Sequence, residues 1–151
     1  MNYYSASLEV PFGLSGEAEF NQDPASWVDG VKPFTRIDLV LFQLPIPDFT
    51  TTDGVYFAVP ALAAELRALH GLRERSFTLA FDEQMEELGE FAGKTIPELV
   101  CFEVTGKFGT DDFAHLDGEP DLLVSELALS VLRRFNLGEL SEIAPFSSSS
   151  R

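Results

Sequence analysis

The side chains with the clearest potential for chemistry are the two histidines, His70 and His115. His115 lies in the run Asp111-Asp112-Phe113-Ala114-His115-Leu116-Asp117. A histidine among carboxylates can act as a base with a raised pKa, or it can bind a metal. No second ligand stands at metal-binding spacing, so the pattern predicts a solvated loop histidine and no metal or cofactor. His70 closes a predicted helix, where a cation near the negative end of the helix dipole needs no catalytic role.

The run Asp117-Gly118-Glu119-Pro120-Asp121 carries oxygen ligands at alternate positions, as calcium loops do. An EF-hand loop starting at Asp117 needs Gly at its sixth position and Glu at its twelfth, where this chain has Leu122 and Ala128. The sequence also lacks the motifs of serine hydrolases, P-loop proteins, dinucleotide-binding proteins and zinc proteases. We therefore expect a protein that is not an enzyme. The alternative is a small metal-dependent hydrolase that uses His115 and the loop at 111–121.

Acidic residues dominate the charge, because 25 Asp and Glu stand against 10 Lys and Arg and the formal net charge is −15. This charge repels phosphate backbones, so we expect no nucleic-acid binding. It attracts a basic protein and raises its association rate, although acidity also serves solubility alone.

Two acidic segments stand out, and each is either a solvated face or a docking surface for a basic protein. The candidate docking residues are Asp82, Glu83, Glu86, Glu87 and Glu90 in the first segment, then Asp111, Asp112, Phe113, Asp117, Glu119 and Asp121 in the second. Aromatic side chains near them are candidate apolar anchors: Phe81, Phe91, Phe108 and Phe113.

The single cysteine, Cys101, stands in the apolar run Leu99-Val100-Cys101-Phe102 and is predicted to be a buried thiol. No stretch of 18 apolar residues is present to span a membrane. The first 31 residues contain no Lys or Arg, which a secretory signal would need. We expect a cytoplasmic protein with no membrane partner.

Apolar runs bounded by Gly and Pro predict strands at residues 3–10, 34–42, 55–59, 76–81, 99–105, 122–124 and 140–146. Pro60 opens a predicted helix over 61–69, and Ser125 is the predicted N-cap of another. Asp82 caps either a short acidic helix over 82–91 or an irregular segment. Loops are predicted at 21–33, 45–54 and 111–120. The pattern predicts the α+β class: a single domain over residues 1–146, with a mixed or antiparallel sheet and two to three helices, and a disordered tail over 147–151.

The C-terminal part of the chain resembles a known family. The pattern consists of Asp112-Phe113-Ala114-His115-Leu116, Asp121-Leu122-Leu123-Val124-Ser125-Glu126, Leu132-Arg133-Arg134-Phe135-Asn136-Leu137-Gly138 and Ile143-Ala144-Pro145-Phe146. These segments give an apolar strand ending in V-S-E, then a helix, then a final strand near a proline. This order resembles the C-terminal signature of small bacterial immunity proteins of polymorphic-toxin systems, in particular the family numbered eleven.

The resemblance implies a cytoplasmic protein that protects its producer by binding a cognate toxin and occluding its active site, without turnover. The negative charge suits a toxin whose active-site cleft is basic because it handles nucleic acid or nucleotides. The sequence therefore predicts an immunity protein that covers such a cleft with one or both acidic segments. A further alternative is an adaptor or chaperone for a secreted effector, which binds its partner without inhibiting it.

Overall fold

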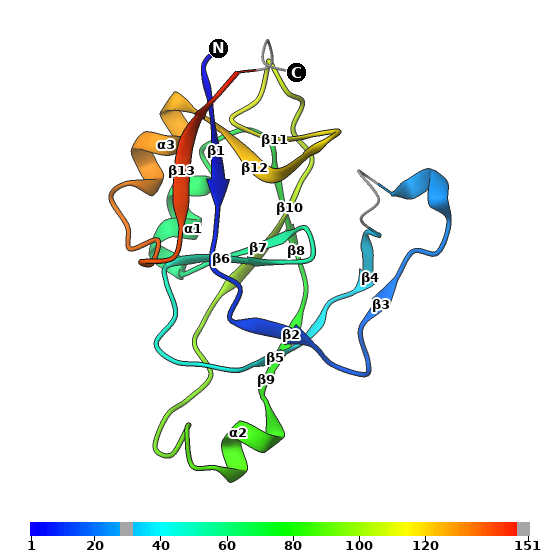
Figure 1. Cartoon of the computed structure of the whole chain (residues 1–151), viewed down its shortest axis with the longest axis vertical. Coiled ribbons are helices and arrows are strands. Elements are labelled where there is room, and N and C mark those ends of the chain that lie inside the picture. Colours follow the sequence, from blue (N-terminus) through cyan, green and yellow to red (C-terminus); the bar gives the residue numbers. More distant parts are fainter. Residues whose placement is uncertain (28–31, 148–151) are drawn as a thin grey trace.

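The computed structural model of the chain describes residues 1–27 and 32–147 (Figure 1). Within these residues it has the predicted α+β fold, with three α-helices and four mostly antiparallel sheets. The predicted tail falls outside the described residues except for Ser147, and so does part of the predicted loop at 21–33. None of the described helices is long and apolar enough to cross a membrane.

The first sheet joins the start of the chain to its last third, in the strand order β11-β12-β1-β13. Its strands are β1 (Tyr3–Ser7), β11 (Phe113–Leu116), β12 (Glu119–Ser125) and β13 (Glu142–Phe146). All neighbours in this sheet run antiparallel. The predicted loop at 111–120 is therefore wrong, because β11 and the start of β12 form a hairpin there.

The second sheet lies in the middle of the molecule and has the order β6-β7-β10-β8 (Figure 1). Its strands are β6 (Phe49–Thr52), β7 (Val55–Ala58), β8 (Leu72–Arg75) and β10 (Val100–Val104). Asp53 and Gly54 connect β6 to β7 with φ angles of 47° and 86°. Two consecutive positive φ angles are typical of the type I′ turn that Asp-Gly favours in hairpins. The predicted loop at 45–54 missed this hairpin.

The remaining strands form a three-stranded sheet and a short ribbon. The sheet has the order β2-β5-β9, with β2 at Phe12–Leu14, β5 at Asp38–Leu41 and β9 at Thr78–Phe81, and its β5 and β9 run parallel. The ribbon pairs β3 (Glu19–Phe20) with β4 (Phe34–Arg36). The single predicted strand at 34–42 is thus two strands in different sheets. They separate at Ile37, whose side chain is buried and whose carbonyl accepts the Thr78 N–H at 3.0 Å.

The helices begin where the local signals predict. α1 spans Pro60–Leu66, α2 spans Glu83–Glu87 and α3 spans Glu126–Leu132, and a 3₁₀ turn covers Pro24–Ser26. Pro60 is in the first turn of α1, and the Ser125 hydroxyl accepts the Ala128 N–H at the start of α3. Asp82 caps α2 by accepting the Met85 N–H at 3.1 Å, so the acidic helix is confirmed in shortened form.

β7, in the interior of the second sheet, is buried on both faces, and the described residues form a hydrophobic core on each side of it. Tyr56 and Ala58 of β7 face the first core, which also contains side chains of α1, α3 and the first sheet. Val55 and Phe57 alternate with them and face the second core, against β2 and β5. Cys101 lies in the second core as predicted, where burial raises the pKa of its thiol to about 12.

Candidate functional site

The first acidic segment projects from the body as a lobe, which we define as residues 82–98, between β9 and β10. Figure 1 shows α2 and its flanking loops at one end of the molecule's longest axis. Glu83, Glu86, Glu87 and Glu90 are all exposed there, and Asp82 is half-buried at the helix cap. The structure therefore brings the five predicted residues of this segment together on one feature, which we call the acidic lobe.

Aromatic and aliphatic contacts hold the acidic lobe on the body. Phe91 is buried and stacks on Phe81 of β9, with ring centroids 4.2 Å apart and planes inclined by 14°. Ile96 packs against the second core. These two phenylalanines anchor the lobe itself, so neither presents a free ring to a partner. The exposed apolar side chain of the lobe is Leu88, at 73% exposure, which the sequence analysis missed although glutamates surround it.

The carboxylates of the acidic lobe have no cationic partner among the described residues. The ion pairs of the body use other acids: Arg36 with Glu17 and Asp38, Arg67 with Glu74, Arg73 and Arg75 with Glu103, and Arg134 with Glu65. The ion pairs of the described residues therefore engage acids of the body and none of the acidic lobe.

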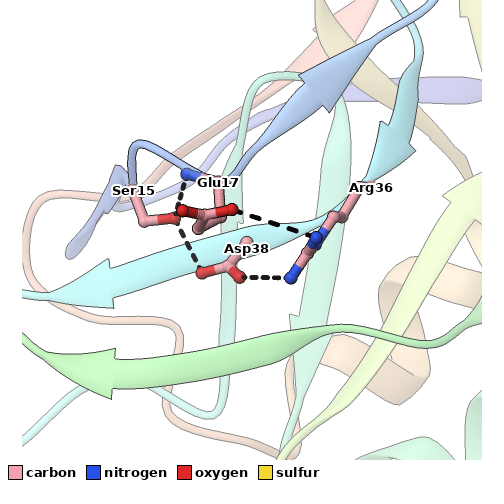
Figure 2. A network of polar contacts seen from close by, with 4 residues as sticks. All are labelled: Ser15, Glu17, Arg36 and Asp38. Carbon is pink, nitrogen blue, oxygen red and sulfur yellow. Dashed lines mark hydrogen bonds and ion pairs between the residues drawn. The ribbon is translucent and has the colours of Figure 1, made fainter.

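One of these body networks shows how arginine and hydroxyl donors contact carboxylates of the body (Figure 2). The Ser15 hydroxyl donates to Asp38 at 2.7 Å, and the Arg36 guanidinium lies 3.6 Å from the other oxygen of this carboxylate. Glu17 lies 4.0 Å from the same guanidinium, and its N–H donates to Ser15 at 3.1 Å. The hydrogen bond from Ser15 is the main reason that the pKa of Asp38 is lowered. Within residues 1–27 and 32–147, no comparable donor set surrounds the glutamates of the acidic lobe.

The second acidic segment is not a continuous surface, because two of its predicted docking residues lie inside. Asp112 is 7% exposed and accepts hydrogen bonds from the Ser125 hydroxyl at 2.7 Å and from the His70 N–H at 2.9 Å. Phe113 is completely buried in the first core. Their assignment to a docking surface is corrected: Asp112 braces the start of α3, and Phe113 fills the core.

The other residues of this segment are distributed around the β11–β12 hairpin. Asp111 accepts the Lys107 N–H at 2.6 Å, Asp117 lies in the hairpin turn, and Glu119 is the first residue of β12. Burial, with the neighbouring Glu119, raises the pKa of Asp121. Figure 1 places this hairpin toward the opposite end of the long axis from α2. The two acidic segments therefore lie on different parts of the molecule.

Phe108, the fourth predicted anchor, is also packed within the molecule. Its ring lies 4.6 Å from that of Tyr3 and 5.8 Å from that of Phe146, measured between centroids. The Tyr3 hydroxyl in turn donates to the Asp111 carbonyl at 2.7 Å. This aromatic group ties the segment before β11 to the two strands β1 and β13.

His115 is the titratable group with the most distinctive surroundings. Its Nε2 lies 2.9 Å from the hydroxyl oxygen of Tyr56, a side chain that is only 5% exposed in the central sheet. Burial lowers the pKa of His115 and raises that of Tyr56. The prediction of a solvated loop histidine is wrong, and so is the alternative of a raised pKa, because burial and not the nearby carboxylates governs this imidazole.

His115 and Tyr56 line a pocket of about 330 Å³ at the junction of three sheets. The described lining comes from the β3–β4 ribbon, the Asp53–Gly54 turn, the ends of β8 and β10, and the β11–β12 hairpin. These segments are remote in sequence, so no local pattern could have revealed the pocket. Across the described residues, no three His, Cys, Asp or Glu side chains are grouped to hold a metal ion.

Comparisons of the chain with protein-family models, with curated proteins and with solved structures found no match.

Proposed function

We propose that this protein is a non-catalytic inhibitor that binds a basic toxin, as an immunity protein does, and that the acidic lobe is its docking surface. The observation that carries the proposal is a group of exposed carboxylates, with no ion pair to any described residue, around an exposed leucine on a projecting feature. Rim charges set association rate and partner choice, whereas buried apolar groups set the lifetime of a complex. The rim charges would come from Glu83, Glu86, Glu87 and Glu90, and the apolar group from Leu88.

The size of the molecule is adequate for such an interface. Tight inhibitors bury about 800 Å² on each partner. This is roughly a tenth of the 8365 Å² surface of the protein. Because about 20–30 residues per side contribute to such an interface, the acidic lobe would form its centre and the adjoining body its periphery.

Capture of the partner from the native source tests the function itself. The protein is immobilised, and its complexes are recovered at low and then at high salt. A single near-stoichiometric basic protein, lethal when expressed alone and harmless when co-expressed with this chain, is the expected result. A captured partner that keeps its full activity in the complex would instead assign the adaptor role. Failure to capture any partner, from a source that expresses both, would reject inhibition by binding.

Two triple variants with the same net charge test the docking surface. Replacing Glu86, Glu87 and Glu90 by Lys moves the formal net charge from −15 to about −9 by the pH 7 charges of these side chains. The control replaces Glu19, Glu139 and Glu142, also by Lys. These three residues are exposed, form no ion pair among the described residues, and lie outside the lobe. Both variants therefore lose the same amount of long-range attraction to a basic partner.

The lobe variant is expected to associate with the captured toxin at least about tenfold more slowly than the control variant at low salt. Leu88→Ala is expected to act differently, by raising the dissociation rate with little effect on association. Stopped-flow or surface-based kinetics separate the two rates. Equal association rates for the two triple variants would remove the acidic lobe from the interface.

A further inference from the structure

The three-stranded sheet β2-β5-β9 has one covered face and one outer face. Leu39 and Leu41 of β5 point into the second core and are at most 1% exposed. Successive side chains of a strand point to opposite faces, so the residues between these lie on the outer face. Gly13, Val40 and Ala80 are direct neighbours there and form one row across the three strands. A sheet with one covered face ordinarily carries polar side chains on the other, whereas this row is apolar and small.

The ring of Phe42 lies over this row. Phe42 follows β5 directly and is 41% exposed. A Cβ on Gly13 would collide with this ring, with its Cζ only 2.9 Å away, and would lie 3.5 Å from Cγ2 of Val40. The ring therefore occupies the space that a side chain at position 13 would need, beside Val40. We call Gly13, Val40, Phe42 and Ala80 the outer apolar patch; none of these residues belongs to either core.

Polar groups border the outer apolar patch on one side. Asp38 and Thr78 form the next row of the same face, two residues before the patch residues of β5 and β9. The Ser15 hydroxyl donates to Asp38 at 2.7 Å, and the Arg36 guanidinium lies 3.6 Å from this carboxylate (Figure 2). An apolar centre with a polar rim is the ordinary composition of a protein–protein interface.

The acidic lobe borders the patch on the other side. The lobe begins directly after β9, and the N–H of its first residue, Asp82, donates to the Leu41 carbonyl at 3.0 Å. It therefore starts beside the end of β5, where Phe42 follows, and Figure 1 shows α2 next to this sheet. The lobe contains six acids and one base, Lys94, which gives it a formal charge of −5. Apolar and acidic surfaces thus adjoin at this end of the molecule.

A basic protein suits these adjoining surfaces better than a second copy of the chain. Another copy carries the same formal net charge of −15 and is repelled. A basic protein is attracted by the carboxylates of the lobe, and an apolar side chain among its Lys and Arg residues would reach the patch. Charges raise the association rate of such a complex, and buried apolar contacts lower its dissociation rate.

We infer that the outer apolar patch is a second contact region for the basic partner, and that Phe42 is its apolar anchor. The inference rests on the proposed function, because it assumes the partner that the acidic lobe attracts. It adds that the basic surface of this partner contains an apolar side chain that packs on Phe42 and Val40. The lobe guides association, and the patch, together with Leu88, slows dissociation.

Ala80→Gln tests the patch without a change of charge. The substitution adds bulk at an exposed position of β9, an edge strand. Ala144→Gln is the matched control, since Ala144 is an exposed alanine of β13, an edge strand of the first sheet. The probe is the basic protein that the wild type captures from its native source. Ala80→Gln is expected to raise the dissociation rate of this complex at least about tenfold, and the control to stay within about twofold of the wild type.

Phe42→Ala tests the anchor itself. Loss of the ring is expected to raise the dissociation rate at least about tenfold and to leave the association rate at low salt nearly unchanged, because no charge is removed. Leu127→Ala removes a 59% exposed leucine of α3, outside the patch, and is the control. Urea denaturation of each variant confirms that it is folded before its kinetics are compared.

The outcomes separate this inference from the function on which it rests. Dissociation rates of Ala80→Gln and Phe42→Ala equal to those of their controls would reject the patch, while the bound partner would still support the acidic lobe. An effect of Ala80→Gln alone would reject Phe42 as the anchor. Failure to capture any basic partner would reject both proposals. A wild-type dimer in sedimentation that Ala80→Gln converts to a monomer would assign the patch to a second copy and overturn the inference.

Discussion

Asp112→Ala is expected to destabilise the protein by about 3 kcal/mol, although the sequence context presents this residue as one more surface acid. Its carboxylate accepts from the Ser125 hydroxyl at 2.7 Å and from the His70 N–H at 2.9 Å. A hydrogen bond to an ionised group contributes about 1.5–3 kcal/mol, and a buried donor left without an acceptor costs about 1–3 kcal/mol. The release of a buried carboxylate from its desolvation offsets part of this sum, which brings the net loss to about 3 kcal/mol.

Urea denaturation at 25 °C, followed by far-ultraviolet circular dichroism, measures this loss if the slope of the transition is unchanged. Asp112→Asn keeps one acceptor oxygen and is expected to lose about half as much as the alanine variant. Glu139→Ala, an exposed acid without an ion pair among the described residues, is the control and is expected to stay within about 0.5 kcal/mol of the wild type.

A double-mutant cycle with Ser125→Ala identifies the contact responsible. Ser125 caps α3 through the Ala128 N–H at 3.1 Å while it donates to Asp112, so the two substitutions remove one shared network. The coupling free energy is expected to be about 1 kcal/mol or more. Additive effects, or an Asp112→Ala loss as small as that of the control, would refute the bracing role and return Asp112 to the candidate docking residues.

Three further predictions concern backbone packing, an unsatisfied hydroxyl and pH. Gly71→Ala is expected to lower the free energy of unfolding, measured by urea denaturation, by more than about 3 kcal/mol. Its φ is +114°, and a Cβ at this position would lie 2.4 Å from the Phe113 carbonyl oxygen. Gly16→Ala is the control and is expected to be tolerated, because its Cβ would meet no atom within 4 Å. Thr50→Val is expected to raise the free energy of unfolding by about 1 kcal/mol, since the buried Thr50 hydroxyl has no hydrogen-bond partner among the described residues; a loss would show that the hydroxyl is satisfied. Burial lowers the pKa of His115 in the folded state. The stability that this imidazole contributes is therefore present above pH 6.5 and is lost as the pH falls below 6.5. The wild type is expected to lose more stability than His115→Gln between about pH 7.5 and 5. The opposite order would indicate a raised pKa.

Local signals predicted the helices because helix starts are encoded in a few adjacent residues. Pro60 and the caps Asp82 and Ser125 determine where α1, α2 and α3 begin, independently of the rest of the fold. Strands with an apolar run were also found, such as β7 and β10. Their continuous apolar character follows from burial on both faces, which removes the usual alternation.

Strands with polar residues were missed, because their partners are distant in the chain. β8 has the sequence Leu-Arg-Glu-Arg and is an edge strand, where charged side chains are common. β11 and the first half of β12 lie in an acidic run that also contains Gly118, and only their pairing in the first sheet makes them strands. Composition alone therefore assigned them to a loop.

The residues of the candidate site also divide into those that the sequence predicted and those that it misassigned. The acidic lobe is exposed because its segment is short and charged and has little apolar face to bury. The sequence analysis identified its acidic residues for this reason. Asp112 and Phe113 were misassigned because their partners, Ser125 and the first core, reach them only through the hairpin. The docking role of the lobe stays a prediction until the kinetic comparison is made.

The position of β1 has a consequence for the order of events during synthesis. Tyr3 pairs with Ser125, about 120 residues later in the chain. At about 5–20 residues per second, the ribosome needs roughly 6–24 s to deliver this partner. The central sheet and its hairpin can assemble within that interval, because all four of its strands lie between Phe49 and Val104. β1 therefore leaves the ribosome well before both strands that pair with it, β12 and β13, and until they arrive its backbone and the side chains of Tyr3 and Ala6 stay open to water, chaperones or other chains.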